Sequence, residues 1–138
     1  MALDNPKILV VDDETTIRHV LKQMLAMKNC QIRQAGSAEE ASTVLAEWEP
    51  DVALLDISMP GKSGIQLLEE IKEQYPHTEV LIMTSYVSTE SVQRAIRAGA
   101  HDYLSKPFKL TDVWDTIARA LSKRGKVIEH NKLHLAHR

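Results

Sequence analysis

The sequence of 138 residues is poor in cysteine and aromatic residues and lacks an excess of either charge. Cys30 is the one cysteine, which excludes an intramolecular disulfide, and we expect it to be a small buried side chain. The formal net charge of −2 lacks the basic excess that is typical of nucleic-acid-binding domains. We therefore expect no direct nucleic-acid binding by this segment.

Long apolar runs are also missing. No run approaches the roughly 20 residues of a membrane span, and the start of the chain, Met1 to Pro6, lacks the basic and apolar regions of a signal peptide. The hydrophobic fraction of 43% and the charged fraction of 26% are typical of globular proteins. These observations predict a domain without a membrane partner, located in the cytoplasm.

Short runs of apolar, often β-branched residues alternate with amphipathic helical patterns. The predicted strands are Lys7 to Val11, Gln31 to Ala35, Asp51 to Asp56, Glu79 to Thr84 and Asp102 to Ser105. Helical spacing of apolar residues follows each strand, in Ile17, Leu21 and Leu25, in Ala41, Val44 and Leu45, in Ile65, Leu68 and Ile71, in Val92, Ala95 and Ile96, and in Leu110, Trp114, Ile117 and Leu121. The alternation predicts βα units in a parallel sheet with helices on both faces.

Several helix ends can also be predicted. Ser37 and Glu40 have the spacing of a capping box at the start of the second helix. Gly99 and Gly125 stand where the fourth and fifth helices should stop.

Acidic residues follow two of the predicted strands. Asp12 and Asp13 come directly after the first strand, and Asp56 ends the third. Open parallel sheets place their chemistry at the carboxyl ends of the strands. Carboxylates crowded there would repel one another unless a divalent cation lay among them. The acids therefore predict a Mg²⁺ site.

Two further polar residues end later apolar runs and should reach the same sheet edge. Thr84 closes the fourth predicted strand, and Lys106 follows the fifth and precedes Pro107. A cation, a hydroxyl, an ammonium group and a carboxylate nucleophile together favour transfer of a phosphoryl group onto an aspartate. Asp56 is the candidate acceptor.

Four short segments, in their order along the chain, resemble the receiver domain of two-component response regulators. They are Val11 to Glu14, Leu55 to Gly61 with Gly64, Met83 to Ser85, and Ala98 to Phe108. The resemblance implies an α/β fold, a flavodoxin-like doubly wound (βα)5 sandwich whose five-stranded parallel sheet has the order 2-1-3-4-5. We expect the receiver domain over residues 1–124 and a linker or C-terminal tail over residues 125–138.

The resemblance also implies roles for the residues at the strand ends. Asp56 would accept a phosphoryl group from a phosphohistidine of a sensor histidine kinase or phosphotransfer protein, or from a small acyl phosphate. The implied ligands of Mg²⁺, or of Mn²⁺ in its place, are Asp13, Asp56 and the Ser58 backbone carbonyl, with Asp12 acting through water. The implied phosphoryl-binding groups are Lys106, Thr84 and the backbone amides of Ser58 and Ser85.

The expected function is that of a switch. Thr84 would move toward the phosphoryl group, and Tyr103 would turn into the vacated space, remodelling the face made by the fourth helix, fifth strand and fifth helix. Such a chain catalyses its own phosphorylation and dephosphorylation and is not a turnover enzyme on an external substrate. We expect an output domain to lie outside this chain. We also expect homodimerisation that phosphorylation promotes, with Trp114, Leu121, Ile128 and Leu135 at heptad spacing.

Two other classes use related features. A phosphatase or mutase with an aspartate nucleophile normally needs a second acid two residues later, where this chain has Ser58. A nucleotide-binding protein of the same fold class needs a hydroxyl- or glycine-rich phosphate loop, whereas the segment Asp12 to Glu14 would repel phosphate. Incubation with Mg²⁺ and acetyl phosphate separates a receiver, which is modified, from an enzyme, which turns over an organic phosphate.

Overall fold

The computed structural model describes residues 5–59, 63–85 and 89–124 of the chain. Five parallel strands form one sheet in the order β2-β1-β3-β4-β5. The strands are β1 (Lys7–Val11), β2 (Gln31–Ala35), β3 (Val52–Asp56), β4 (Glu79–Thr84) and β5 (Asp102–Ser105). The helices are α1 (Thr15–Ala26), α2 (Ala38–Glu47), α3 (Gly64–Gln74), α4 (Thr89–Arg97) and α5 (Leu110–Arg124). The predicted fold class and strand order are confirmed.

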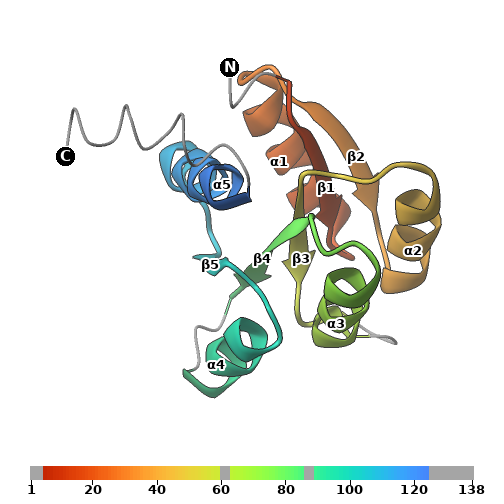
Figure 1. Cartoon of the computed structure of the whole chain (residues 1–138). Helices are drawn as coiled ribbons and strands as arrows, with labels where there is room; N and C mark the ends of the chain where they lie inside the picture. Colours follow the sequence, from red (N-terminus) through yellow and green to blue (C-terminus); the bar gives the residue numbers. More distant parts are fainter. Residues whose placement is uncertain (1–4, 60–62, 86–88, 125–138) are drawn as a thin grey trace.

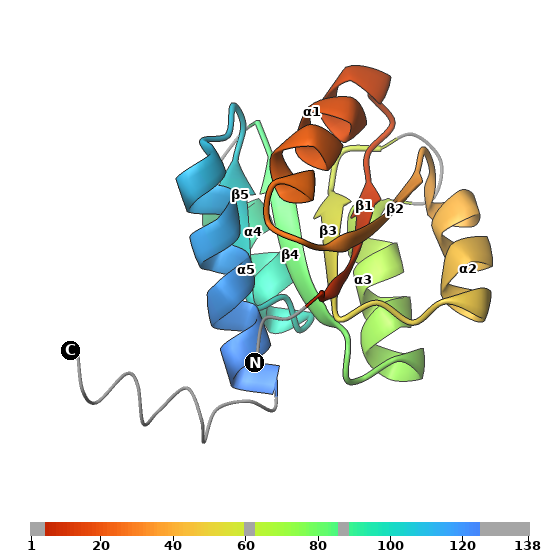
Figure 2. The ribbon, with the colours of Figure 1, turned by 90° about the horizontal axis from the view of Figure 1, so that it is seen from above.

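The sheet is the middle layer of a three-layer sandwich. Helices α1 and α5 cover one face, and α2, α3 and α4 cover the other (Figures 1 and 2). Alternate residues of β1 point to opposite faces, with Ile8 and Val10 packing in the α1 and α5 layer and Leu9 and Val11 in the opposite layer. Both layers bury apolar side chains, so β1, β3 and β4 have apolar residues at consecutive positions, as in sheets covered on both sides.

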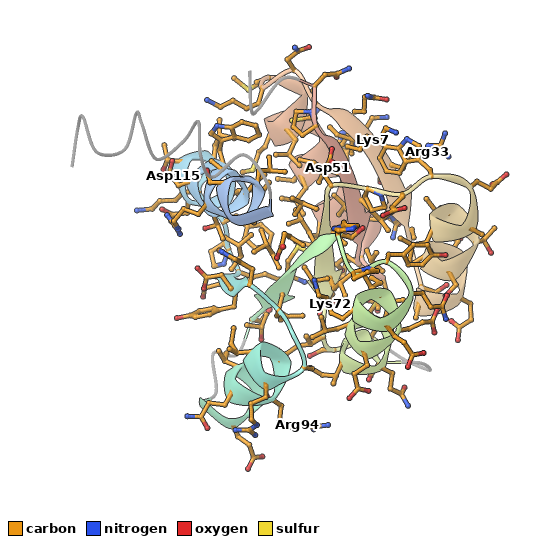
Figure 3. All side chains as sticks on the ribbon, in the orientation of Figure 1. Lys7, Arg33, Asp51, Lys72, Arg94 and Asp115 are labelled. Atoms are coloured by element: carbon orange, nitrogen blue, oxygen red, sulfur yellow. The ribbon has the colours of Figure 1, made fainter. Side chains whose placement is uncertain are left out.

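The amino ends of the strands are tied together by hydrogen bonds to the backbone. The Asp51 carboxylate accepts a hydrogen bond from the Lys7 backbone amide at 2.8 Å, near the position where Figure 3 labels both residues. Thr78 Oγ1 donates to the Pro50 carbonyl at 2.7 Å. Strand β3 begins at Val52, one residue later than predicted, and the Asp51 side chain links the residue before β3 to the first residue of β1.

The predicted helix ends are partly confirmed. Gly99 has a positive φ of 113°, and the Gly99 and Ala100 amides donate to the carbonyls of Ile96 and Ala95, which is a Schellman motif. Ser37 caps α2, but the Glu40 carboxylate accepts from the Gly36 amide at 2.6 Å, so only half of the predicted capping box forms. The complete box lies at α3, between Ser63 and Gln66. Gly125 lies outside the described residues.

Two other expectations concern exposure. Cys30 is only partly buried, which corrects the prediction of a buried side chain, and burial raises the pKa of its thiol. A raised thiol pKa keeps the group protonated at neutral pH and unreactive. Within the ranges that the structure describes, no helix is long and apolar enough to cross a membrane.

Candidate functional site

The acidic residues meet at the carboxyl ends of β1 and β3, which are neighbours in the sheet. Val11 pairs with Leu55 in the parallel register, so the residues that follow the two strands lie side by side. One carboxylate oxygen from each of Asp12, Asp13 and Asp56 lies within 4.8 Å of the others. Asp12 is fully buried, Asp56 is 5% exposed and Asp13 is exposed. The predicted convergence of these acids is confirmed.

Lys106 contacts the acids from the end of β5, which is separated from β3 by β4 in the sheet. It follows β5, precedes a cis peptide bond to Pro107, and its amide donates to the Thr84 carbonyl at 2.9 Å. The Lys106 ammonium nitrogen Nζ lies 2.7 Å from Asp12 Oδ2 and 3.6 Å from Asp56 Oδ2. The distance from Nζ to Glu14 Oε1 is also 3.6 Å. One buried ammonium group is therefore shared among several carboxylates.

Backbone amides hold the two buried carboxylates in place. Asp12 Oδ1 accepts from the Glu14 amide at 2.9 Å, and Asp56 Oδ1 accepts from the Ser58 amide at 2.9 Å. In both cases an aspartate bonds the amide two residues ahead, which is the geometry of an Asx-turn. Each turn orients one oxygen and leaves the other oxygen of the same carboxylate to face Lys106.

The Asp56 pKa is raised above its ordinary value. Burial is the main cause, because it disfavours the charged form; the Ser58 amide lowers the pKa, the Asp12 charge raises it, Lys106 lowers it, and Asp13 raises it. The charged form of Asp56 is therefore disfavoured, mainly by burial. A cation bound beside the carboxylate would favour the charged form.

The Lys106 pKa is also raised. Burial alone would lower it, but the hydrogen bond to Asp12 and the charges of Asp12, Asp56 and Glu14 outweigh burial. Lys106 is therefore an ammonium ion at neutral pH. Three clustered carboxylates beside a single ammonium leave a negative site, and carboxylate oxygens are the ligands that Mg²⁺ and Mn²⁺ prefer. The donor set fits a hard divalent cation.

A hollow of about 200 Å³ opens beside the cluster. Its lining residues are Asp13, Glu14, Asp56, Ser58, Ser85 and Lys106. Ser58 and Ser85, the residues whose backbone amides were predicted to bind phosphoryl oxygens, thus lie at the same opening as Asp56. Thr84 is buried at the end of β4, and Tyr103 on β5 is 38% exposed, so its ring faces solvent.

Gly64 allows the start of α3 to approach the end of β3. A Cβ atom built on Gly64 would lie 2.6 Å from the Ile57 Cα atom and would also clash with the Asp56 carbonyl oxygen. Both atoms belong to backbone that cannot move aside without displacing Asp56. The absence of a side chain at residue 64 is therefore part of how the Asp56 loop is held.

We expect Gly64→Ala to lower the free energy of unfolding by about 1–3 kcal/mol, the usual cost of overpacking. Urea denaturation measures this change. Gly36→Ala is the matched control and should lose less stability, because the nearest atom to its added Cβ, Arg18 Nη1 at 3.2 Å, belongs to a side chain and not to the backbone. Equal losses in the two variants would contradict the proposed close approach.

Two residues near the acids had no predicted role. Glu14 lines the hollow, and the Arg18 guanidinium donates from Nη1 to the Asp12 carbonyl oxygen at 2.6 Å. Arg18 lies in the first helical turn after the acid pair, with its amide bonded to the Glu14 carbonyl. Its closeness in sequence to Asp12 and Asp13 could have indicated a role at the site. A helical arginine is, however, usually an exposed surface residue.

A parallel α/β sheet with three acids and a lysine at its carboxyl edge is the arrangement that the resemblance to receiver domains implies. Residues 8–118 match the family described as the response regulator receiver domain, and the chain belongs to that family. Receiver domains of response regulators are signalling switches of two-component systems, which agrees with the resemblance seen in the sequence.

Curated relatives include regulators of the same kind. The chain is 36% identical over 130 residues to the regulatory protein AtoC of Escherichia coli strain K12, covering 94% of this chain and 28% of that protein. It is 38% identical over 115 residues to the DNA-binding transcriptional regulator NtrC of Salmonella typhimurium, covering 83% of this chain and 24% of that protein. The chain thus spans about a quarter of the length of these relatives.

Solved structures show the same fold. A CheY-like receiver domain protein from Methanospirillum hungatei JF-1 superposes with a TM-score of 0.84 at 30% identity, covering 89% of this chain and 98% of that one. NtrX from Brucella abortus superposes with a TM-score of 0.85 at 34% identity, covering 94% of this chain and 29% of that one.

Proposed function

We propose that this chain is a phospho-accepting switch in which Asp56 takes a phosphoryl group from the phosphohistidine of a histidine kinase or phosphotransfer protein. The observation that carries the proposal is the geometry at Asp56. Its carboxylate lies at a solvent-accessible hollow, within 4.8 Å of the Asp12 and Asp13 carboxylates and 3.6 Å from the Lys106 ammonium. A carboxylate nucleophile, two further acids and the Lys106 ammonium group therefore lie at one opening.

In the proposed step a carboxylate oxygen of Asp56 attacks phosphorus and forms an acyl phosphate. The bond from phosphorus to the donor's imidazole nitrogen breaks, and its electron pair leaves with the imidazole. Hydrolysis completes the cycle: a water oxygen bonds to phosphorus, the bond from phosphorus to the Asp56 oxygen breaks, and inorganic phosphate leaves with the Asp56 carboxylate restored. The catalysis is mainly positioning and charge stabilisation, because phosphoryl transfer requires little covalent help from the protein.

The Asp13 and Asp56 side chains and the Ser58 carbonyl would hold Mg²⁺ or Mn²⁺, with Asp12 acting through water. When bound, the cation supplies neutralising charge for the acids and the phosphoryl oxygens. The Lys106 ammonium, already 3.6 Å from Asp56 Oδ2, would pair with one phosphoryl oxygen. The Thr84 hydroxyl and the backbone amides of Ser58 and Ser85 would bind the others.

Phosphorylation would change the surface of α4, β5 and α5. An aspartyl phosphate adds about two negative charges beside the end of β4. Thr84 would move toward them, and the solvent-facing Tyr103 would turn inward, so that a partner could distinguish the two states. We propose that residues 1–124 form this receiver, that it acts in the cytoplasm, and that its partners include an output domain and a second phosphorylated copy.

The length of the relatives supports an output domain outside this chain, since both curated relatives are about four times as long as their matched part. We propose that residues 125–138 form the linker or tail. The predicted heptad continuation through Ile128 and Leu135 lies outside the described residues.

Incubation of the chain with acetyl phosphate and Mg²⁺ tests the proposed function. We expect one base-labile phosphoryl group per chain by intact mass spectrometry, and no adduct when EDTA is present from the start of the incubation. Steady turnover of p-nitrophenyl phosphate without a stable adduct would instead indicate a phosphatase and would contradict the switch.

A further inference from the structure

Arg18 on α1 makes close contacts with the backbone of the acid cluster. Its Nη1 donates to the Asp12 carbonyl oxygen at 2.6 Å, and its Nη2 donates to Thr15 Oγ1 at 3.2 Å. The guanidinium also lies against Gly36, where an added Cβ would be 3.2 Å from Nη1. Two hydrogen bonds and this packing contact therefore hold the planar group in one orientation.

These contacts fix the backbone conformation of Asp13. The peptide group before Asp13 contains the Asp12 carbonyl, which Arg18 binds, and the peptide group after it contains the Glu14 amide, which Asp12 Oδ1 binds at 2.9 Å. Because peptide groups are planar, the orientations of these two groups set φ and ψ of Asp13. Both peptide groups that flank Asp13 are thus held by side chains.

Asp12 can act as the anchor because it is itself held firmly. It is fully buried, its amide donates to the Ala35 carbonyl at 3.1 Å, and its Oδ2 accepts from Lys106 at 2.7 Å. Asp13, by contrast, is exposed and lies on the turn between β1 and α1. Its direction therefore depends on the backbone that Arg18 and Asp12 hold.

We propose that Arg18 is a positioning residue that directs the Asp13 carboxylate toward Asp12 and Asp56 and thereby sets the affinity for the divalent cation. This inference rests on the proposed function, because it concerns the same metal site. Residues that orient metal ligands without touching the metal commonly change metal affinity by 10–100-fold when they are removed.

A role through charge and a role through positioning predict opposite changes in cation affinity when Arg18 is removed. If the guanidinium acted only through its positive charge, its removal would make the site more negative and would tighten cation binding. If it positions Asp13, its removal weakens cation binding despite the more negative site. The sign of the change in affinity therefore separates the two roles.

Calorimetric titration of the unphosphorylated chain with Mg²⁺ alone tests the proposal. We expect Arg18→Ala to weaken binding about 10-fold or more. Arg18→Lys should give a smaller loss, because lysine keeps the charge but lacks the rigid fork that reaches two acceptors. The control is Arg119→Ala on α5, whose side chain is 59% exposed and pairs with Asp102 instead, and it should bind Mg²⁺ as the wild type does.

A double-mutant cycle provides the decisive readout. In an Asp13→Ala background, Arg18→Ala should cause almost no further loss, because Arg18 acts through Asp13. Equal losses in both backgrounds, or unchanged or tighter binding by Arg18→Ala alone, would overturn the proposal. Circular dichroism verifies folding, and Arg18→Lys is judged by the same criteria if Arg18→Ala does not fold. Absence of Mg²⁺ binding by the wild type would contradict the metal site itself rather than the role of Arg18.

Discussion

Asp56→Asn is expected to abolish phosphorylation while preserving the fold. The substitution removes the nucleophilic carboxylate, but the amide oxygen can still accept the hydrogen bond that the Ser58 amide donates at 2.9 Å. Lys106 keeps its closer partner, Asp12 Oδ2 at 2.7 Å. Mass spectrometry after incubation with acetyl phosphate and Mg²⁺ should therefore show one added phosphoryl group on the wild type and none on the variant.

The same substitution should also stabilise the protein when Mg²⁺ is absent. The Asp56 pKa is raised in the folded chain, so the folded state binds the Asp56 proton more tightly than the unfolded state. Ionisation of Asp56 therefore costs stability as the pH rises from the unfolded pKa through the folded one, and this cost persists at neutral pH. The side-chain amide of the variant carries no charge, so urea denaturation in EDTA at pH 7 should show a higher midpoint for Asp56→Asn.

The matched control is Asp115→Asn, because Asp115 is an exposed carboxylate on α5 (Figure 3) that does not belong to the acid cluster. This variant should be phosphorylated as fully as the wild type and should have the same urea midpoint. An equal adduct on Asp56→Asn would show that another residue accepts the phosphoryl group. A lower urea midpoint for Asp56→Asn than for the wild type would show that the Asp56 charge stabilises the fold.

Asp13→Ala is expected to weaken metal binding, whereas Lys106→Ala is not. Asp13 contributes one of the clustered carboxylates and lines the hollow. Its loss should weaken Mg²⁺ binding about 10-fold or more, since each 1.4 kcal/mol of lost binding free energy is a factor of 10. Lys106 instead neutralises the acids, so its removal should leave Mg²⁺ binding at least as tight as in the wild type.

Phosphorylation should fall in both variants, but for different reasons. Asp13→Ala loses a proposed metal ligand, and its rate should recover at raised Mg²⁺ concentration. Lys106→Ala loses the ammonium that pairs with the phosphoryl oxygen, so no Mg²⁺ concentration should restore its rate. Titration calorimetry with Mg²⁺ and a time course of the phosphoryl adduct measure the two effects. Wild-type Mg²⁺ affinity in Asp13→Ala would show that Asp13 is not a ligand.

Local patterns in the sequence were enough to predict the strands and the edge of the sheet where the polar residues gather. Strands β1, β3 and β4 each contain a short apolar run, and such runs can be recognised without knowledge of their neighbours. Asp12, Asp13 and Asp56 directly follow or end such runs, so a parallel sheet must bring them to one edge. The order of the strands came from the family resemblance, because an apolar run does not specify which strand pairs with it.

Only the tertiary structure decided which atoms meet. Lys106 contacts Asp12 across 94 residues of sequence, and its partners depend on how the ends of β1 and β5 are placed in the sheet. Glu40 bonds the Gly36 amide and not the Ser37 amide, a choice between neighbouring donors that depends on the path of the chain into α2. The contact of Arg18 with the Asp12 carbonyl likewise depends on a side-chain orientation that packing against Gly36 helps to set. Periodicity along a chain reflects which face of an element is buried, whereas hydrogen-bond partners reflect distances between elements, and those distances exist only after the layers have packed.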